Sequence, residues 1–436
     1  MRLIVQKYGG TSVGTPERIR NVARRLVETQ REGCQVVAVI SAMAGVTDEL
    51  VKLAHQVSPN PTARELDILL ATGEHGATAL TAMAVNALGG RAISLTGAQA
   101  GILTDRNHAK ARIANISPKQ IHELLSDDYI VIVAGFQGQT PEGETTTLGR
   151  GGSDLTAIAL AGALNADVCQ IFTDVDGVFT CDPRLVTDAK KLDEVAYDEL
   201  LEMSSAGSKV MQSRAVEFAK KFGIEFEVRS SFKTNTGTVA REASPSMEDV
   251  VIRGISLDRH QAKLTVAGVR DEPGIAGRIF SNIAAAHIIV DMIVQNASIR
   301  GTTDISFTIH EDELENARKI LMPVVSEVGA TRLNTASGVA KLSVVGIGMR
   351  SHSGVAARMF ECLGRGGINI QLVSTSEIKI AVIIDEKDAE RAARLIHANF
   401  GLARLVPAAG TARSQQPSKG LSVPKRRGTR KGTPKV

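Results

Sequence analysis

The sequence predicts an α/β protein, in which a mainly parallel sheet is sandwiched by helices and followed by two smaller α+β units. Two observations lead to this fold class. Through residues 1–243, short apolar runs alternate with helical stretches, which is the chain order of a parallel sheet covered on both faces. Beyond residue 250 the chain repeats itself with a period of eighty residues, which suits a βαββαβ unit in tandem.

The first half contains the elements of the sheet in sequential order. Thr15 can cap a helix, and Pro16 suits the first helical position, where its missing N–H would be unpaired anyway. Asp176-Gly177 predicts a hairpin turn. Strands are expected at residues 3–5, 35–40, 92–95, 129–134 and 168–172, and helices from residue 16, near 48–56, through Glu74 to about Leu88, and at 155–164.

The repeat defines the second half. Residues 274–280 match residues 354–360, with apolar strands expected before them at 264–268 and 342–346 and after them at 289–292 and 369–372. A linker rich in Ser and Pro lies at residues 241–249, and an apolar pattern is lost from residue 408. The predicted division is a first domain at 1–243, two repeat units at 250–335 and 338–407, and a basic, disordered tail at 408–436.

Composition excludes several classes of protein. The formal charge is +4, but residues 408–436 contain eight basic and no acidic residues, so the rest of the chain carries −4. Aromatic residues make up 3%, which argues against stacking of nucleic-acid bases. No cysteines form a CxxC pair, and no apolar stretch is long enough to span a bilayer. A cytoplasmic protein without a zinc site is expected.

A strand–glycine–helix turn at Lys7-Tyr8-Gly9-Gly10 is the first candidate site. Adjacent glycines let the backbone approach a ligand and point N–H groups at an anion, and Lys7 adds a positive charge. The turn is neither a Walker loop nor a dinucleotide fingerprint. It suits a polyphosphate held beside a fixed ammonium, although a tight turn with a surface lysine is an equally common explanation.

A second glycine loop surrounds Arg150. Gly149, Gly151 and Gly152 flank this arginine, which can bind a carboxylate bidentately beside the exposed amides of a helix N-terminus. The alternative is that Ser153 or Asp154 merely caps the helix, but a cap does not require the glycines and the arginine. Further along, Asp174, Asp182 and Arg184 suit contacts with a nucleotide or Mg²⁺, and Lys209 suits a second cation on a phosphate. Taken alone, Glu74 is best explained as an ordinary solvated carboxylate, and Thr47-Asp48 has the alternative explanation of a helix cap.

Together these motifs resemble the aspartokinase family. The matching stretches, in that family's order, are KYGGTSV (7–13), SAM (41–43), TGE (72–74), GRGGSD (149–154), TDVDGV (173–178), DPR (182–184) and GSKVMQSR (207–214). The repeat resembles paired ACT domains, which bind free amino acids. The resemblance covers about residues 1–405.

The resemblance implies phosphorylation of L-aspartate by MgATP, with no metal held by protein ligands alone. It implies that Lys7 and Lys209 neutralise the transferring phosphoryl group, that Asp154 orients Lys7, that Glu74 binds the substrate's ammonium and that Arg150 binds its α-carboxylate. The implied ATP site comprises Lys7, Tyr8, Gly9, Gly10, Ser41, Thr173, Asp174, Phe179, Asp182, Arg184 and Lys209, and the implied substrate site comprises Thr47, Glu74, Arg150, Gly151, Gly152 and Ser153.

The ACT-like repeat implies feedback by lysine, threonine or both, at an interface within a homodimer or higher oligomer. Gly274 and Gly354 each precede a helix and offer its free amides to a carboxylate. The expected effector site comprises Gly274, Ile289, Val290, Asp291, Gln295, Asn369, Ile370 and Thr375.

Other functions remain open at this point. Kinases for glutamate, N-acetylglutamate, carbamate and UMP share the fold and the Lys-Gly-Gly start. A non-catalytic amino-acid sensor with an inactive kinase domain is a different class, and the intact Lys7, Asp154 and Lys209 argue against it. The acidic charge of the rest of the chain argues against nucleic-acid binding through the basic tail.

Overall fold

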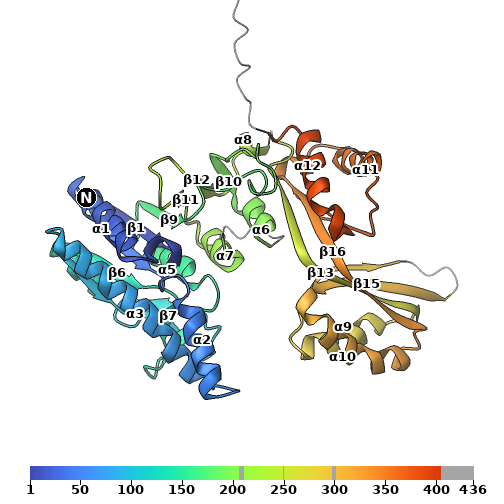
Figure 1. Cartoon of the computed structure of the whole chain (residues 1–436), viewed down its shortest axis with the longest axis horizontal. Helices are drawn as coiled ribbons and strands as arrows, with labels where there is room; N and C mark the ends of the chain where they lie inside the picture. The colour runs from blue at the N-terminus through green and yellow to red at the C-terminus, as the bar shows by residue number, and fades with distance from the viewer. Residues whose placement is uncertain (206–210, 249, 297–300, 404–436) are drawn as a thin grey trace, which may run out of the picture. The chain divides into compact units, whose positions relative to one another are not determined.

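An eight-stranded, mostly parallel sheet forms the centre of the first part of the chain (Figure 1). The computed structural model describes residues 1–205, 211–248, 250–296 and 301–403. The strands lie in the order β10-β12-β11-β9-β1-β2-β6-β3, and only β11 and β12 run antiparallel to each other. Their bounds are β1 (Arg2–Tyr8), β2 (Cys34–Ile40), β3 (Ala92–Leu95), β6 (Ile130–Ala134), β9 (Val168–Thr173), β10 (Glu194–Ala196), β11 (Phe226–Ser230) and β12 (Thr238–Arg241).

Helices cover both faces of this sheet, as the sequence predicts. They are α1 (Pro16–Arg31), α2 (Val46–Val57), α3 (Ala63–Ala87), α4 (Lys119–Ser126), α5 (Gly152–Ala163), α6 (Tyr197–Ser205), α7 (Ser213–Phe222) and the short α8 (Pro245–Glu248), with a 3₁₀ turn η1 at Gly10–Val13. The Thr15 side chain caps α1 by accepting from the N–H of Arg18. A separate four-stranded sheet, β5-β4-β7-β8, is built from β4 (Ile102–Thr104), β5 (Ile113–Ile116), β7 (Gln137–Gln139) and β8 (Thr145–Thr147).

The central strands are buried on both faces, which explains their continuous apolar sequences. In β2, Val37 and Val39 pack with residues of α5, while Val36, Ala38 and Ile40 pack with residues of α1 and α3. Successive side chains of a strand point to opposite faces, so one apolar run supplies two cores.

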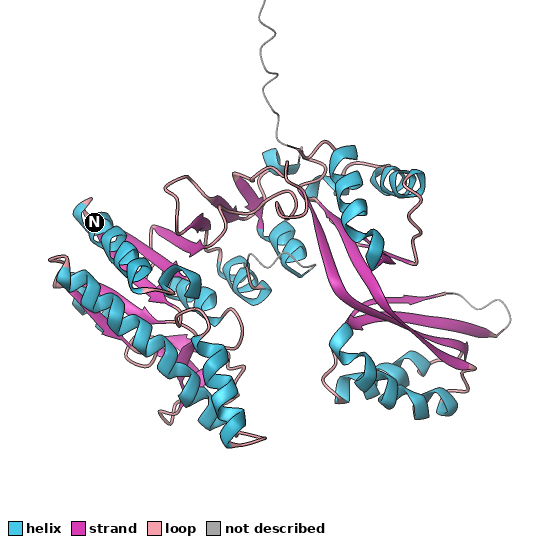
Figure 2. Cartoon of the chain, viewed as in Figure 1, coloured by secondary structure: helices cyan, strands magenta, loops and turns pink. Residues whose placement is uncertain are grey.

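The second half forms one six-stranded sheet in the order β14-β15-β13-β16-β18-β17, and Figure 2 shows its two long strands side by side. The strands are β13 (Gly254–Arg270), β14 (Val290–Gln295), β15 (Thr302–His310), β16 (Arg332–Val345), β17 (Leu372–Thr375) and β18 (Lys379–Asp385). The helices are α9 (Ile275–Ala285), α10 (Leu314–Glu327), α11 (Val355–Arg365) and α12 (Ala389–Asn399), with 3₁₀ turns η2 (Glu311–Glu313), η3 (Ile347–Arg350) and η4 (Glu386–Asp388). The border predicted at residues 335–338 falls within β16, so the two repeat units share one sheet.

Two local expectations are wrong. The sequence Asp176-Gly177 does not close a hairpin, because β9 is already paired in parallel on both edges, with β1 and β11, and Phe179 instead forms a bridge with Lys191. The strand expected at 369–372 begins only at Leu372. The strand starts late because the residues after α11 cap the end of that helix: the N–H of Gly367 donates to the carbonyl of Gly364, and the N–H of Ile368 donates to the carbonyl of Leu363.

The predicted tail at 408–436 lies outside the described residues. Among the helices within the described ranges, none is both long and apolar enough to cross a membrane.

Candidate active site

The predicted loops meet at the carboxyl ends of four neighbouring strands, β9, β1, β2 and β6. The N–H of Gly9 donates to the carbonyl of Phe172 (3.2 Å), and the N–H of Ser41 donates to that of Tyr8 (3.1 Å). The N–H of Gly135 in turn donates to the carbonyl of Ile40 (3.0 Å). Ligands of parallel sheets bind at this edge, where the strand ends leave backbone groups unpaired. The segments expected to hold phosphate and nucleotide are therefore adjacent in space.

A buried ion pair lies beside the first glycine loop. The Nζ of Lys7 is 2.6 Å from the Oδ1 of Asp154, which belongs to the first turn of α5. A methyl group added at Gly9 would lie 3.4 Å from this Nζ, and one added at Gly10 would lie 2.7 Å from the carbonyl oxygen of Ala42. The absence of a side chain at Gly9 leaves room beside the ammonium, and the absence of one at Gly10 lets this loop approach the backbone of Ala42 closely. Such a fixed cation beside backbone amides can hold a phosphate.

Glu74 of α3 is a buried carboxylate in which only one of the two oxygens has a hydrogen-bond partner among the described residues. Its Oε1 accepts from the N–H of Ala42 (3.2 Å), and its Oε2 has no partner among the described residues. Burial raises the pKa of Glu74 from 4.5 to about 7. A buried carboxylate with an open oxygen is costly unless a cation reaches it, so this position suits the ammonium of a ligand.

The Arg150 loop owes its backbone conformation to the glycines on either side of the arginine. Gly149 and Gly151 have φ angles of 76° and 70°, in the left-handed region that glycine adopts without strain. Arg150 is exposed and makes no hydrogen bond or ion pair with any described residue. Gly151 is the N-cap of α5, and no described side chain caps this helix, so the alternative explanation of Ser153 or Asp154 as a cap does not hold. The N–H of Gly152 donates to the carbonyl of Gly149 (3.0 Å), so the amides of the first turn that are left for a ligand are those of Ser153 and Asp154.

Thr47 lies inside the first turn of α2, whose N-cap is Gly45, so the alternative explanation of Thr47 as a helix cap does not hold either. Its side chain is half-buried. Tyr8 is fully buried and stacks on Phe172 with ring centroids 4.8 Å apart, which fixes the ends of β1 and β9 against each other. Only the backbone of Tyr8 is therefore available to a ligand.

Five of the residues predicted for the nucleotide line one cavity of about 540 Å³. They are Thr173, Asp174, Phe179, Asp182 and Arg184, and the wall is completed by Val175, Gly177, Val178, Cys181, Pro183, Met203 and Ile255. The guanidinium of Arg184 bonds the carboxylate of Asp182 (2.7 Å) and holds its pKa below the usual value. Within the described ranges, no group of three or more His, Cys, Asp or Glu side chains is arranged to hold a metal.

Sequence reasoning missed the part of this wall that comes from other elements. Met203 belongs to α6 and Ile255 to β13, and both are ordinary apolar residues in the sequence. No local signal distinguishes them from core residues. Lys209, predicted as a second cation, lies outside the described residues.

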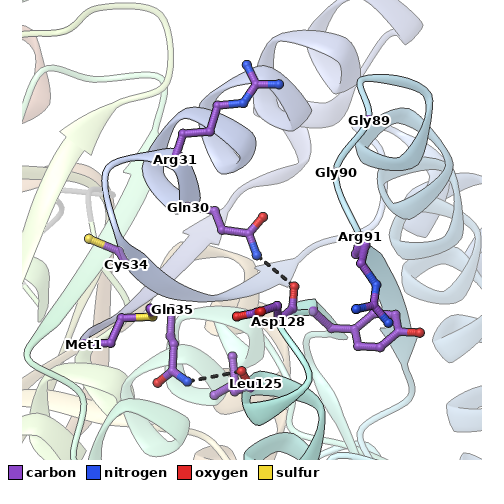
Figure 3. A pocket seen from close by; sticks show the side chains of 11 residues that line it. Met1, Gln30, Arg31, Cys34, Gln35, Gly89, Gly90, Arg91, Leu125 and Asp128 are labelled. Carbon is purple, nitrogen blue, oxygen red and sulfur yellow. Dashed lines mark hydrogen bonds between the residues drawn. The ribbon is translucent and has the colours of Figure 1, made fainter.

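A second cavity, of about 330 Å³, lies at the opposite edge of the sheet, where β2 begins (Figure 3). It is lined in part by Gln30, Arg31, Gln35 and Arg91, and none of the predicted site residues borders it. The two amides already donate to backbone carbonyls, and the Arg91 guanidinium lies over the ring of Tyr129. The candidate active site is therefore the carboxyl edge.

The residues predicted for an effector lie on two edge strands and two helix starts. Gly274 and Gly354 are the N-caps of α9 and α11, with φ angles of 90° and 89°. Ile289 precedes β14, which contains Val290, Asp291 and Gln295; Thr375 ends β17, but Asn369 and Ile370 precede that strand rather than belonging to it. The carboxylate of Asp291 is not free, because it pairs with the buried ammonium of Lys341.

This fold and site define a class, the amino acid kinase family. The sequence model of that family matches residues 2–230, and the model of the ACT domain matches residues 264–322 and 342–400. The latter two matches confirm the expected tandem unit.

Known proteins define the family more narrowly. The chain is 50% identical to an aspartate kinase of Stutzerimonas stutzeri over 94% of its own length and 100% of that protein. Two crystal structures of E. coli aspartokinase III, at 25% sequence identity, are similar to this chain. The complex with aspartate and ADP (R-state) has a TM-score of 0.76, and the complex with lysine and aspartate (T-state) has a TM-score of 0.74. Each match covers 91% of this chain and 99% of the E. coli chain. The chain belongs to the aspartokinase family, and the prediction of a kinase of this family is confirmed.

Proposed function

We propose that the protein phosphorylates the β-carboxylate of L-aspartate with MgATP, giving 4-phospho-L-aspartate, the first step of lysine, threonine and methionine biosynthesis. The observation that carries this proposal is the buried oxygen of Glu74 that has no partner among the described residues. Glu74 lies close to the Lys7 loop, because its other oxygen accepts from the N–H of Ala42, and the N–H of the preceding Ser41 donates to the carbonyl of Tyr8. An ammonium-bearing substrate meets this demand. The complex of a structural relative with aspartate and ADP supports the same substrate pair.

The substrate is held at both ends of its α-amino acid group. Glu74 binds the ammonium, and Arg150 binds the α-carboxylate together with the amides at the start of α5. Thr47, Gly151, Gly152 and Ser153 line the same position. The β-carboxylate is then the only reactive group left, and it is ionised at neutral pH. The reaction therefore needs no general base, and catalysis depends on positioning and charge neutralisation.

The phosphate side of the site is formed by Lys7 and its neighbours. ATP supplies the phosphoryl group, with Mg²⁺ bound to its phosphates. Lys7 neutralises charge that develops on the transferring group, and Asp154 keeps its ammonium in place. The sequence predicts phosphate contacts from the N–H groups of both Gly9 and Gly10, but the N–H of Gly9 already donates to the carbonyl of Phe172, so the N–H of Gly10 is the one that binds a phosphate oxygen. Lys209 is proposed as a second cation there. The nucleotide contacts Ser41, Thr173, Asp174, Phe179, Asp182 and Arg184.

A single assay tests the substrate assignment. The protein is incubated with ATP, Mg²⁺ and one of L-aspartate, L-glutamate or N-acetyl-L-glutamate, and any acyl phosphate is trapped with hydroxylamine. We expect a hydroxamate with aspartate only. A product with N-acetylglutamate would contradict the role of Glu74, because that substrate has no ammonium.

Feedback regulation by lysine and threonine is the second part of the proposal. The free amides at Gly274 and Gly354 receive effector carboxylates, and polar groups of β14, of β17 and of the segment before β17 receive the rest of the ligand. The lysine-bound T-state of a structural relative supports an amino-acid effector. Inhibition requires only that the effector bind a low-activity state better, by about 1–3 kcal/mol.

The repeat region is also the proposed dimer interface. β14 and β17 are the two edge strands of their sheet, and they also contact each other within this chain. The backbone groups that an edge strand leaves unpaired can bond to a strand of another chain. Ile289 and Ile293, at β14, are 84% and 53% exposed, which is unusual for large apolar residues unless a partner covers them. Light scattering after gel filtration tests this, and we expect a dimer or a higher oligomer of this chain. A monomer at micromolar concentration would contradict the proposal.

A further inference from the structure

Asp67 of α3 is a fully buried carboxylate that the proposed mechanism does not use. It lies seven residues before Glu74, so the two carboxylates project from the same side of one helix, two turns apart. Burial of an ionised group is unfavourable unless hydrogen bonds replace its water. The bonds that Asp67 makes therefore identify what it stabilises.

Its partners among the described residues come from two segments beside the Arg150 loop: residues 108–109, and β8, which leads into that loop. The Oδ2 of Asp67 accepts from the Nδ1 of His108 (2.8 Å), and both oxygens accept from the N–H of Ala109 (3.1 and 3.0 Å). Its Oδ1 also accepts from the Oγ1 of Thr147 (2.5 Å), the last residue of β8. Ala109 has a φ of 66°, a conformation that alanine rarely adopts and that these bonds hold in place.

The segment held by Asp67 carries the turn to Arg150. The N–H of Ala111 donates to the carbonyl of Thr147 (2.9 Å), and a methyl group added at Gly149 would lie 3.2 Å from the carbonyl oxygen of Ala109. Arg214 fixes the same turn from α7, since its guanidinium donates to the carbonyls of Leu148 (2.5 Å) and Ala111 (2.6 Å). The backbone leading to Arg150 is thus bound by two side chains, while the Arg150 side chain bonds to none of the residues that the structure describes.

We propose that Asp67 is a positioning residue for the amino-acid substrate. It ties the turn that carries Arg150 to the helix that carries Glu74, so that one rigid helix sets the separation between the carboxylate-binding and ammonium-binding groups. A small substrate held at both ends is sensitive to that separation, whereas ATP contacts other loops. This inference rests on the proposed function, in which Arg150 and Glu74 bind the same amino acid.

The test is a comparison of two neighbouring threonines of β8. Thr147→Val removes the bond from β8 to Asp67, without a change of charge. Thr146→Val is the matched control, because its equally buried hydroxyl bonds the hydroxyl of Thr104 (2.6 Å) and not Asp67. We expect Thr147→Val to raise the KM for aspartate about tenfold and that for ATP less than twofold. Thr146→Val is expected to leave both KM values within twofold, and Thr147→Ser, which keeps the hydroxyl, to restore the wild-type KM.

Asp67→Asn extends the series, with a larger rise in the KM for aspartate expected because it weakens the bonds to His108 and Ala109 as well. If this variant does not fold, the two threonine variants still decide. Equal effects of Thr147→Val and Thr146→Val would overturn the positioning role while the proposed function stands. Arg150→Ala separates the two failures: an unchanged KM for aspartate in that variant would refute the substrate site itself, and the positioning role with it.

Discussion

The raised pKa of Glu74 makes one prediction that links activity and stability. A shift from 4.5 to about 7 means that the ionised carboxylate costs the folded, substrate-free protein about 3 kcal/mol. Between these two pH values the folded state binds more protons than the unfolded state. The free energy of unfolding of the wild type therefore falls as the pH rises from about 4.5 to about 7, and this loss is complete above that window.

Glu74→Gln removes the ionisable group and keeps the shape of the side chain. Without substrate, we expect the variant to be more stable than the wild type at pH 8, by up to about 3 kcal/mol, and the difference to disappear towards pH 4.5. Urea unfolding of the two proteins at pH 8 and pH 5 measures this difference.

The affinity for aspartate should rise with pH, whereas the free energy of unfolding falls, because the ammonium of aspartate needs the ionised form of Glu74. At pH 6 only about a tenth of the wild-type molecules carry this form, so the KM for aspartate should be about tenfold higher than at pH 8. Glu74→Gln should show a high KM for aspartate that does not depend on pH. Because ATP titrates equally for both proteins, the ratio of the wild-type KM to the variant KM at each pH isolates the contribution of Glu74. A wild-type KM for aspartate that is constant from pH 6 to 8, relative to the variant, would refute the reasoning.

Three further predictions concern other parts of the chain. Lys7→Ala should lower kcat by orders of magnitude with a smaller change in the KM for aspartate, because its charge acts mainly in the transition state; a near wild-type kcat would refute its role. Lysine plus threonine at millimolar levels should inhibit, and Gln295→Ala should relieve this inhibition without lowering the uninhibited kcat; a flat titration of the wild type would refute the regulatory site. Glu199→Ala should lower the free energy of unfolding by about 3–5 kcal/mol, because it leaves the buried Arg253 unpaired, whereas Glu123→Ala in an exposed pair should cost under about 1 kcal/mol in the same urea experiment.

The choice of Gln295 over Asp291 for the effector test follows from a contact that the sequence does not reveal. Asp291 pairs with Lys341, which is buried in β16. Removing Asp291 would leave that ammonium buried without a partner, and the resulting loss of stability would obscure any effect on inhibition. Gln295 makes no such pair among the described residues.

The sequence by itself determined the features that depend on near neighbours. The apolar runs of β2 and β6, the Thr15-Pro16 start of α1 and the glycine turn after Lys7 are all local patterns, and each occurs where the sequence predicts it. The eighty-residue repeat predicted the two helix starts at Gly274 and Gly354 for the same reason. The short strands of the four-stranded sheet were missed, because three or four residues are too few to show a period of two.

The hydrogen-bond partners and the ionisation of buried groups depend on which distant residues the tertiary structure brings together, so they could not be predicted from local sequence patterns. The 173–178 segment reads locally as a hairpin, but β9 already has a parallel neighbour on each edge. Asp67 and Glu74 look alike in the sequence as helical acids, yet one is satisfied by residues 41 to 80 positions away and the other keeps an open oxygen. Hydrogen-bond satisfaction and desolvation depend on which side chains surround a group after folding, and no local pattern encodes that arrangement.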